Sequence, residues 1–377
     1  MPSPASEPRT PIRVGIVGLS TKGGWAARAH VPALAELDGY ELRALSASSA
    51  ESARAAGEKF GVPLTFGSAG ELARSEEVDL VVVTVKVPHH RELILPALEA
   101  GKPVLSEWPL GTDLAQAEEL VALADARGVR TAVGLQARSA PPLRYLRDLV
   151  ADGYVGRVLS TTMVVSGRNW GATFREGGEY LLDRANGATM LTIPFGHTAD
   201  ALTMVLGELT DVSATTATLR PQVTHEVTGR TATMTAEDQI AVTGTLESGA
   251  VAALHFRGGS SRATDFHWEI NGTEGDLVVK ADTAALWMGR ITLHGARGSD
   301  TGLTELPVPA SYERLPRFTG RSAEYAYNVA YAYAQLHDDL TTGTRLTPDF
   351  AHAVRRHRLL DRVQESARTG ARLTVTA

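Results

Sequence analysis

Short apolar runs alternate with segments of helical composition along the first 140 residues. The runs 12–18 (IRVGIVG) and 78–86 (VDLVVVTVK) have strand composition, and the second is continuous enough for a parallel strand buried on both faces. The segments 49–61 (SAESARAAGEKFG) and 114–128 (LAQAEELVALADARG) have helical composition, and each ends at a glycine. Strands separated by helices of this length predict right-handed βαβ units, and therefore a doubly wound parallel sheet of the Rossmann type.

The pattern changes near residue 140. Long β-type runs follow, several of them separated by glycine-containing turns typical of hairpins. These runs lie at 156–168, 209–220, 239–259 and 266–280, and two closing helices are predicted within 322–343 and 349–370. This pattern predicts an α+β domain with a large, mostly antiparallel open sheet.

We therefore divide the chain into three parts. Residues 1–10, rich in proline and serine and without an apolar core, form a disordered lead-in and not a signal peptide. Residues 11–140 form the first domain, and residues 141–377 form the second. No apolar run reaches the length of a membrane span.

Composition narrows the classes of partner. A formal net charge of −6 excludes a broad basic face, so neither a nucleic-acid backbone nor an anionic membrane is expected as a direct partner. The absence of cysteine excludes disulfides, cysteine nucleophiles and thiolate metal sites, and it fits a cytoplasmic protein. The paired histidines His89 and His90 lack a third ligand, so no metal site is predicted.

The glycine-rich stretch after the first strand is the first candidate site. The turn 18–30 (GLSTKGGWAARAH) joins a strand to a helix, and this arrangement directs backbone N–H groups at one point, which suits a pyrophosphate. The second strand ends in serines where an acidic residue would select NAD, so the sequence leans slightly to NADP without excluding NAD. The predicted cofactor contacts here are Gly18, Leu19, Ser20, Lys22, Gly24, Trp25, Ser46 and Ser48.

Three longer motifs carry a family resemblance that covers nearly the whole chain. They lie at 83–111 (VTVKVPHHRELILPALEAGKPVLSEWPLG), 134–141 (GLQARSAP) and 186–209 (NGATMLTIPFGHTADALTMVLGEL). Together they resemble the Gfo/Idh/MocA family of glucose–fructose oxidoreductases and inositol dehydrogenases. The motifs GEYLLD, FGHTADAL and NGTEGDL are further similar to the subgroup of the fungal galactose-pathway repressor, which binds NAD(P) but regulates transcription through a protein partner.

This resemblance implies an NAD(P)-binding first domain and a second domain for substrate binding and oligomerisation, with a homodimer or homotetramer formed through the second domain's sheet. Two positions depart from the enzymatic pattern. The family's Glu-Lys-Pro lysine, which relays a proton beside the nicotinamide, is replaced by Trp108. The aspartate four residues before the family histidine is replaced by Ile193, whereas the histidine itself remains as His197. Proline after an aromatic residue also predicts a cis peptide at Trp108–Pro109.

Further site residues follow from this resemblance and from the strand ends. His197 and Lys86 are the candidate acid–base residues, although His197 alone would equally suit a helix-start histidine bonded to a carbonyl, and Trp170 would equally suit the core. The additional predicted cofactor contacts are Lys86, His90, Glu107, Trp108 and Gln136. The predicted substrate contacts are Arg138, Arg168, Trp170, Tyr180, Asp183, His197 and Asp200.

The sequence therefore favours an NAD(P)-dependent oxidoreductase that acts on a sugar, polyol or sugar-like carbonyl without the family's lysine. A non-catalytic NAD(P)-binding regulator or sensor is the main alternative, because both usual partners of the histidine are missing. A redox-neutral epimerase or lyase with tightly held NAD uses the same architecture. The sequence does not name the substrate or the direction of the reaction.

Overall fold

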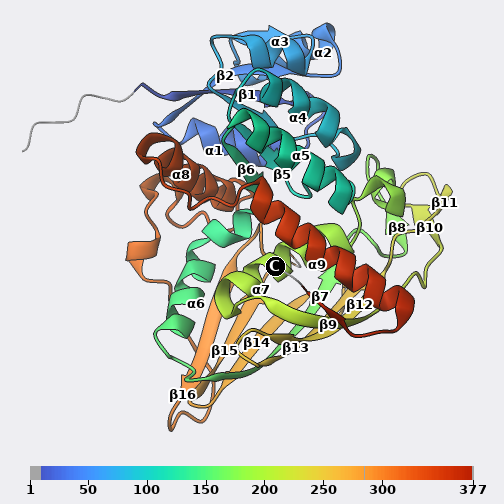
Figure 1. The fold of residues 1–377 in the computed structure, drawn as a ribbon, viewed down its shortest axis with the longest axis vertical. Coiled ribbons are helices and arrows are strands. Elements are labelled where there is room, and N and C mark those ends of the chain that lie inside the picture. The colour runs from blue at the N-terminus through green and yellow to red at the C-terminus, as the bar shows by residue number, and fades with distance from the viewer. Residues whose placement is uncertain (1–9, 284, 376–377) are drawn as a thin grey trace, which may run out of the picture.

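The computed structural model describes residues 10–283 and 285–375, so the predicted lead-in lies outside the described residues except for Thr10. Figure 1 shows a smaller α/β domain stacked on a broad sheet, with helices α7 and α9 lying over that sheet. Both parts of the predicted fold class are confirmed. No helix within 10–283 or 285–375 has the length and apolarity needed to cross a membrane.

The first domain is a six-stranded parallel sheet in the order β3-β2-β1-β4-β5-β6. Its strands are β1 (Ile12–Val17), β2 (Tyr40–Ser46), β3 (Leu64–Phe66), β4 (Leu80–Val83), β5 (Val104–Glu107) and β6 (Thr131–Gly134). The order reverses between β1 and β4, which opens a crevice at the carboxyl ends of these two strands. All four residues of β4 are buried, as its apolar run predicts.

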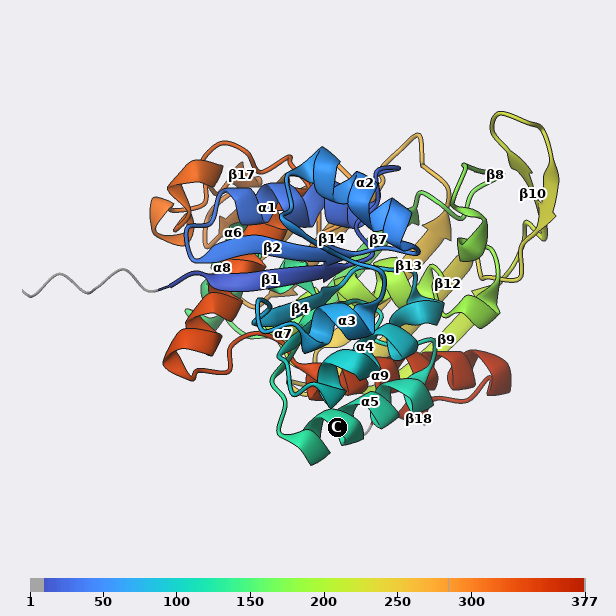
Figure 2. The ribbon, with the colours of Figure 1, turned by 90° about the horizontal axis from the view of Figure 1, so that it is seen from above.

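Helices cover both faces of this sheet. Seen from above, α1 and α2 lie on one side of the strands and α3, α4 and α5 on the other (Figure 2). The helices are α1 (Val31–Ala35), continued backwards by a π-helical turn (Ala26–His30), α2 (Ala50–Phe60), α3 (Ala69–Arg74), α4 (His90–Glu99) and α5 (Leu114–Arg127). Ser49 caps α2 by accepting a hydrogen bond from the Ser52 N–H, and Gly61 ends the helix in the left-handed conformation.

The second domain is built on a nine-stranded sheet in the order β17-β16-β15-β14-β7-β13-β12-β9-β18. Its neighbours pair antiparallel except β7 and β13, which are parallel. The strands are β7 (Val158–Gly167), β9 (Leu209–Ala217), β12 (Gln239–Leu246), β13 (Val251–Gly258), β14 (Phe266–Gly272), β15 (Gly275–Ala281), β16 (Ile291–Arg297), β17 (Thr304–Glu305) and β18 (Leu373–Thr374). Burial alternates along β12 and β13, so one face of the sheet packs inward and the other faces outward.

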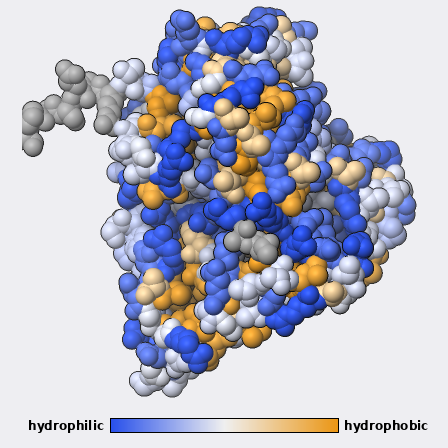
Figure 3. Space-filling view, in the orientation of Figure 1, coloured by the Kyte–Doolittle hydropathy of each residue, from blue (hydrophilic) through white to orange (hydrophobic). Residues whose placement is uncertain are grey.

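Helices α6 (Pro141–Ala151), α7 (Gly196–Leu206) and α9 (Phe350–Thr369) belong to the second domain. A small sheet of β8 (Thr173–Phe174), β10 (Gln222–His225) and β11 (Thr231–Thr233) stands beside the large one. Hydrophobic residues gather where α5 meets α9, as the space-filling view shows (Figure 3). The two domains are therefore joined by packing as well as by the chain.

Helix α8 (Ala326–Thr342) comes late in the sequence but packs into the core of the first domain. Tyr331 and Tyr333 lie in the same hydrophobic cluster as Val14 and Ile16 of β1. The Tyr40 hydroxyl donates to the Tyr333 carbonyl at 2.9 Å, across 293 residues of chain. The first domain's core is therefore completed by a segment that follows the whole large sheet.

Replacing Tyr333 by alanine should lower the free energy of unfolding by about 3–5 kcal/mol, because a fully buried aromatic ring would leave a cavity. Chemical denaturation followed by circular dichroism measures this loss. Tyr325→Ala is the matched control, since Tyr325 is 40% exposed at the start of the same helix and should cost under about 1 kcal/mol. Equal losses in the two variants would contradict the assignment of α8 to the first domain's core.

Candidate cofactor and active site

The turn after β1 leaves open space over its backbone. Gly18, Gly23 and Gly24 have φ values of 99°, 92° and 112°, which favour glycine. A Cβ built on Gly18 would lie 2.6 Å from Val85 Cγ1, whereas a Cβ on Gly23 or Gly24 would meet nothing within 4 Å. The helix that follows starts at Ala26. Residues 18–26 thus offer free backbone beside a helix start, and this cradle fits a dinucleotide pyrophosphate.

The polar groups around this turn differ in exposure and in their hydrogen-bond partners. Lys22 and Ser48 are exposed and Ser46 is buried, while the Ser46 carbonyl accepts the Gly18 N–H at 2.9 Å. Lys59 of α2 donates to the Thr21 carbonyl at 2.6 Å, which brings a positive charge to the turn. Leu19 is buried, and Ser20 accepts the Lys22 N–H through its hydroxyl at 3.2 Å. Trp25 stands over the turn's end, 6.1 Å from the Tyr325 ring.

Glu107, at the end of β5, is the centre of a hydrogen-bonded row across the crevice floor. Its Oε1 lies 3.1 Å from His30 Nε2, and Gln136 Nε2 donates to Oε1 and Oε2 at 2.9 and 2.8 Å. His30 Nδ1 is in turn 2.8 Å from the Tyr333 hydroxyl. The row fixes Glu107 as a positioned acceptor.

The sequence analysis did not single out His30 and Tyr333 as members of this row. His30 closes the glycine-rich turn, and Tyr333 lies in a run of tyrosines that packing alone explains. The one signal in the sequence that could have indicated this row is the position of His30, shortly after Gly23 and Gly24. Their pairing joins positions 303 residues apart, which spacing does not reveal.

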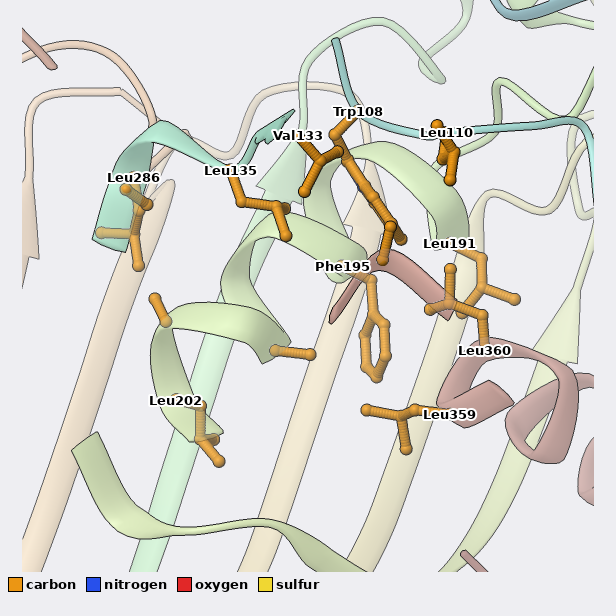
Figure 4. Close-up of a cluster of buried hydrophobic side chains, with 14 of the residues drawn as sticks. Trp108, Leu110, Val133, Leu135, Leu191, Phe195, Leu202, Leu286, Leu359 and Leu360 are labelled. Carbon is orange, nitrogen blue, oxygen red and sulfur yellow. The ribbon is translucent and has the colours of Figure 1, made fainter. Parts of the chain in front are cut away.

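Trp108 points into the core between the domains. Its indole is 5% exposed and lies among Leu110, Leu191, Phe195 and their neighbours, as Figure 4 shows. Its Nε1 donates to the Thr192 carbonyl at 2.7 Å. The predicted cis peptide at Trp108–Pro109 is confirmed.

Other groups shape the site of the indole. A Cβ on Gly196 would lie 2.8 Å from Nε1, so the glycine makes room for the ring. The His357 ring packs on the indole at 4.8 Å. Trp108 therefore contacts protein groups on these sides.

His197 begins helix α7 and is also buried, at 3% exposure. Its ring stacks on Trp287 with centroids 4.3 Å apart and planes inclined by 16°. Burial lowers the pKa of His197 to about 3, against a weaker opposing effect of the Asp200 charge, so the imidazole is neutral at pH 7. Among the described residues Nδ1 has no hydrogen-bond partner.

Asp200 lies one turn further along α7 and is fully buried. Its Oδ1 is 3.1 Å from Arg138 Nη1 and 2.6 Å from His352 Nε2, and Arg356 Nε lies at 3.9 Å. Burial would raise the pKa of Asp200, but the charge on Arg138 and the His352 hydrogen bond outweigh it and hold the pKa far below its usual value. Arg138 therefore binds a protein carboxylate and links the first domain to α7.

Lys86 and Tyr180 meet across the crevice. Lys86 is exposed just beyond β4, and its ammonium lies 4.6 Å from the centre of the Tyr180 ring. Burial raises the pKa of the Tyr180 hydroxyl. This contact joins the end of a central strand in the first domain to a loop of the second. It leaves the Lys86 ammonium exposed next to a partly buried phenol.

The remaining predicted residues take separate positions. His90 Nε2 lies 3.0 Å from the Val85 carbonyl. Burial of the ring lowers the pKa of His90, against the weaker opposing effect of this hydrogen bond. Trp170 is buried with Nε1 donating to the Leu181 carbonyl at 3.0 Å, and the Asp183 side chain accepts the Ala185 N–H at 3.0 Å. Arg168 is exposed at a cavity of the second domain.

The structure brings Glu107 and Gln136 together and pairs Lys86 with Tyr180, but it places His197 and Trp108 in the interior.

The sheet order, the glycine turn and the polar strand ends define a Rossmann dinucleotide-binding protein with an added α+β domain. The NAD-binding Rossmann fold of the GFO_IDH_MocA oxidoreductase family matches residues 12–135. The C-terminal domain of Gal80p matches residues 141–281. The first domain therefore resembles the Rossmann domain of the Gfo/Idh/MocA oxidoreductases, and the second domain is Gal80-like.

Two curated relatives are of different kinds. Dehydrogenase aclE of Aspergillus oryzae is 39% identical over 217 residues, and the match spans 56% of this chain and 59% of aclE. The galactose/lactose metabolism regulatory protein GAL80 of Saccharomyces cerevisiae is 29% identical over 331 residues, which cover 80% of this chain and 75% of that protein. An enzyme and a regulator are thus both among its relatives.

Solved structures agree with this assignment. A super-repressor mutant of Gal80p from Saccharomyces cerevisiae has a TM-score of 0.87 at 25% identity, covering 97% of this chain and 98% of that one. Levoglucosan dehydrogenase in complex with NADH and levoglucosan has a TM-score of 0.84 at 19% identity, covering 98% and 100%. The second likeness shows a shared fold.

The buried histidines make folding stability depend on pH. Burial lowers the pKa of His357 to about 4, as it lowers that of His197 to about 3. The unfolded chain binds these protons below about pH 6.5 and the folded chain does not, so stability is full above pH 6.5 and falls on acidification. We expect a loss of about 2 kcal/mol per histidine between pH 7.5 and pH 5, because one pKa unit corresponds to about 1.36 kcal/mol.

Urea denaturation at the two pH values measures this loss. His357→Gln should remove part of the pH dependence, whereas His89→Gln, on the surface, should leave it unchanged. An equal free energy of unfolding at pH 5 and pH 7.5 would contradict the neutral, buried state of both rings.

Proposed function

We propose that this protein is an NAD(P)-dependent oxidoreductase acting on a sugar, polyol or sugar-like carbonyl compound. The observation that carries the proposal is the Lys86 ammonium, exposed beyond β4 and in contact with Tyr180 of the second domain. Strand ends at this switch point face the bound ligand in such sheets. The relationship to aclE, a dehydrogenase, supports the class of reaction.

The cofactor would be held by residues 18–25 at its pyrophosphate, with Glu107 and Gln136 offering polar groups deeper in the crevice. A bound nicotinamide supplies hydride transfer. Residues 46–49 at the end of β2 carry no carboxylate that would repel a 2′-phosphate, so the proposal includes NADP as well as NAD. Arg54, the nearby cation, is paired with Glu58 at 3.0 Å.

Lys86 is the proposed proton carrier. Its ammonium can give a proton to a substrate oxygen or take one back, while the Tyr180 ring holds it by a cation–π contact. His197 remains the second candidate, and its imidazole is neutral as a base requires. The His197 ring is 3% exposed and one face is stacked on the Trp287 indole, so its access to a substrate is narrower than that of Lys86.

Lys86→Met should lower kcat by about 10²–10⁴-fold if the ammonium exchanges the substrate proton. The assay follows nicotinamide absorbance with NAD or NADP against a panel of sugars, polyols and keto-compounds. Lys280→Met, an exposed lysine on the outer sheet, is the matched control and should retain full activity. Unchanged turnover in Lys86→Met, with a large loss in His197→Gln, would transfer the role to His197.

Gly24→Ala should raise the Kd for the dinucleotide at least about tenfold, because φ of 112° strains a non-glycine residue and the added Cβ enters the proposed pyrophosphate cradle. Calorimetric titration measures the affinity. Gly61→Ala is the control: it imposes similar backbone strain at the end of α2, in open space, and should lower stability but keep the Kd. An unchanged Kd in Gly24→Ala would reject the cradle.

A non-catalytic regulator that senses NAD(P) is the second candidate, and one observation favours it. The two positions nearest the family's chemistry, Trp108 and His197, are buried in protein contacts. The relationship to GAL80 supports this alternative. Tight dinucleotide binding with no turnover on any compound of the panel would replace the enzyme proposal with this one.

Self-association through the large sheet belongs to the same proposal. Its outer face carries exposed side chains on the central strands, among them Val251 at 57% exposure on β13. Light scattering on the purified chain tests it: a monomer at micromolar concentration would reject the homodimer or homotetramer.

A further inference from the structure

A cavity of about 440 Å³ lies in the second domain beside the small sheet. Its walls come from the loop after β7, from β8, and from the segment after β13. The side chains that matter here are Arg168, Asn169, Phe174, Arg175, Arg220 and Glu226. Its volume lies within the range of small-molecule sites, about 300–1,000 Å³.

The cavity carries more positive than negative charge. Three guanidinium groups line it against the single carboxylate of Glu226. Arg175 donates to Glu226 at 2.7 Å, and Arg220 lies 3.2 Å from Asp238, which is buried outside the lining. Within the part of the chain that the structure describes, Arg168 makes no hydrogen bond. Its planar fork of donors is therefore available to a ligand.

The other walls suit an organic molecule with an apolar face. The Phe174 ring forms one side, with the Arg230 guanidinium 5.4 Å from its centre. The floor is main chain: a Cβ on Gly171 would lie 2.9 Å from the Gly259 Cα, so these strands' ends meet without side chains. Gly171 and Gly259 therefore contribute main-chain atoms to the lining of the cavity.

The cavity adjoins the proposed reaction centre. Gly178 and Leu181 line it, and Tyr180, which contacts Lys86, lies between them in the same short helical turn. A neutral sugar has no charged group to pair with the Arg168 guanidinium.

We propose that this cavity binds the anionic group of the substrate, a sugar-sized molecule that carries a phosphate or a carboxylate, through Arg168. This proposal rests on the proposed oxidoreductase function only in calling the bound molecule a substrate. Binding of an anion in the cavity does not depend on turnover. Arg168 selects the charged compound over its neutral analogue, and the ammonium of Lys86 acts at the other end of the molecule.

Calorimetric titration of the full-length protein, saturated with NAD or NADP, tests the proposal with glucose 6-phosphate, glucuronate and glucose. We expect at least one anion to bind at least about tenfold more tightly than glucose, since charge-assisted bonds to arginine would be lost with the neutral sugar. The two anions distinguish phosphate from carboxylate. Arg168→Gln should weaken that anion at least about tenfold, and thermal melting confirms that the exposed substitution leaves the fold intact.

Arg91→Gln is the matched control, because Arg91 is a half-exposed arginine paired with Glu119 on the first domain and should leave the Kd unchanged. Equal binding of glucose and both anions, or no effect of Arg168→Gln, would overturn the anion site. Turnover of a neutral sugar that is insensitive to Arg168→Gln would overturn it while leaving the oxidoreductase intact. Arg168-dependent binding without any turnover would retain the anion site and remove the enzyme function.

Discussion

The junction of the two domains depends on one buried charge. Asp200 is removed from water on all sides, so its carboxylate is stable only while cationic and hydrogen-bonding partners surround it. Arg138 comes from the end of the first domain, and His352 and Arg356 come from α9. Removing one partner of a buried ion pair typically costs about 3–5 kcal/mol, so the contact holds the domains in a single arrangement. Helix α7, and with it His197, takes its position from this carboxylate.

The fixed position of α7 also explains the orientation of the Trp108 side chain. Gly196 has no side chain, and the Thr192 carbonyl precedes it within a π-helical turn. Together they form a surface that accepts an indole and its N–H. A π turn closes with an i→i+5 hydrogen bond and so holds one residue more than an α turn. The Trp108 side chain thus makes the end of β5 part of the domain junction.

Much of the fold could be predicted from the sequence because it follows local rules. The β-branched run of β4, the serine cap of α2 and the glycine that ends it each depend on neighbours in the chain. The contacts within the candidate site could be predicted less well from the sequence. The chemistry of Glu107 depends on His30 and Tyr333, which meet it only after the chain has closed, and the direction of the Trp108 side chain depends on Gly196.

The burial of individual side chains also could not be predicted from the sequence. The family resemblance predicts an acid–base role for His197, but its ring is buried and stacks on Trp287, 90 residues later in the chain. Likewise Arg138 follows a strand end and is predicted from the sequence as a substrate contact. In the structure its guanidinium pairs with Asp200. Such outcomes are decided by packing between elements that no local pattern relates.

The late position of α8 has a consequence for how the chain reaches this state. During synthesis, β1 to β6 emerge first, but their core lacks Tyr331 and Tyr333 until almost the whole chain has been made. The first domain therefore does not finish folding before the second, in contrast to the usual order of N-terminal domains. Closing a contact over 293 residues is also slow, since the loop entropy is lost before the contact forms. The first domain can thus complete its core only after residues 326–342 have been made.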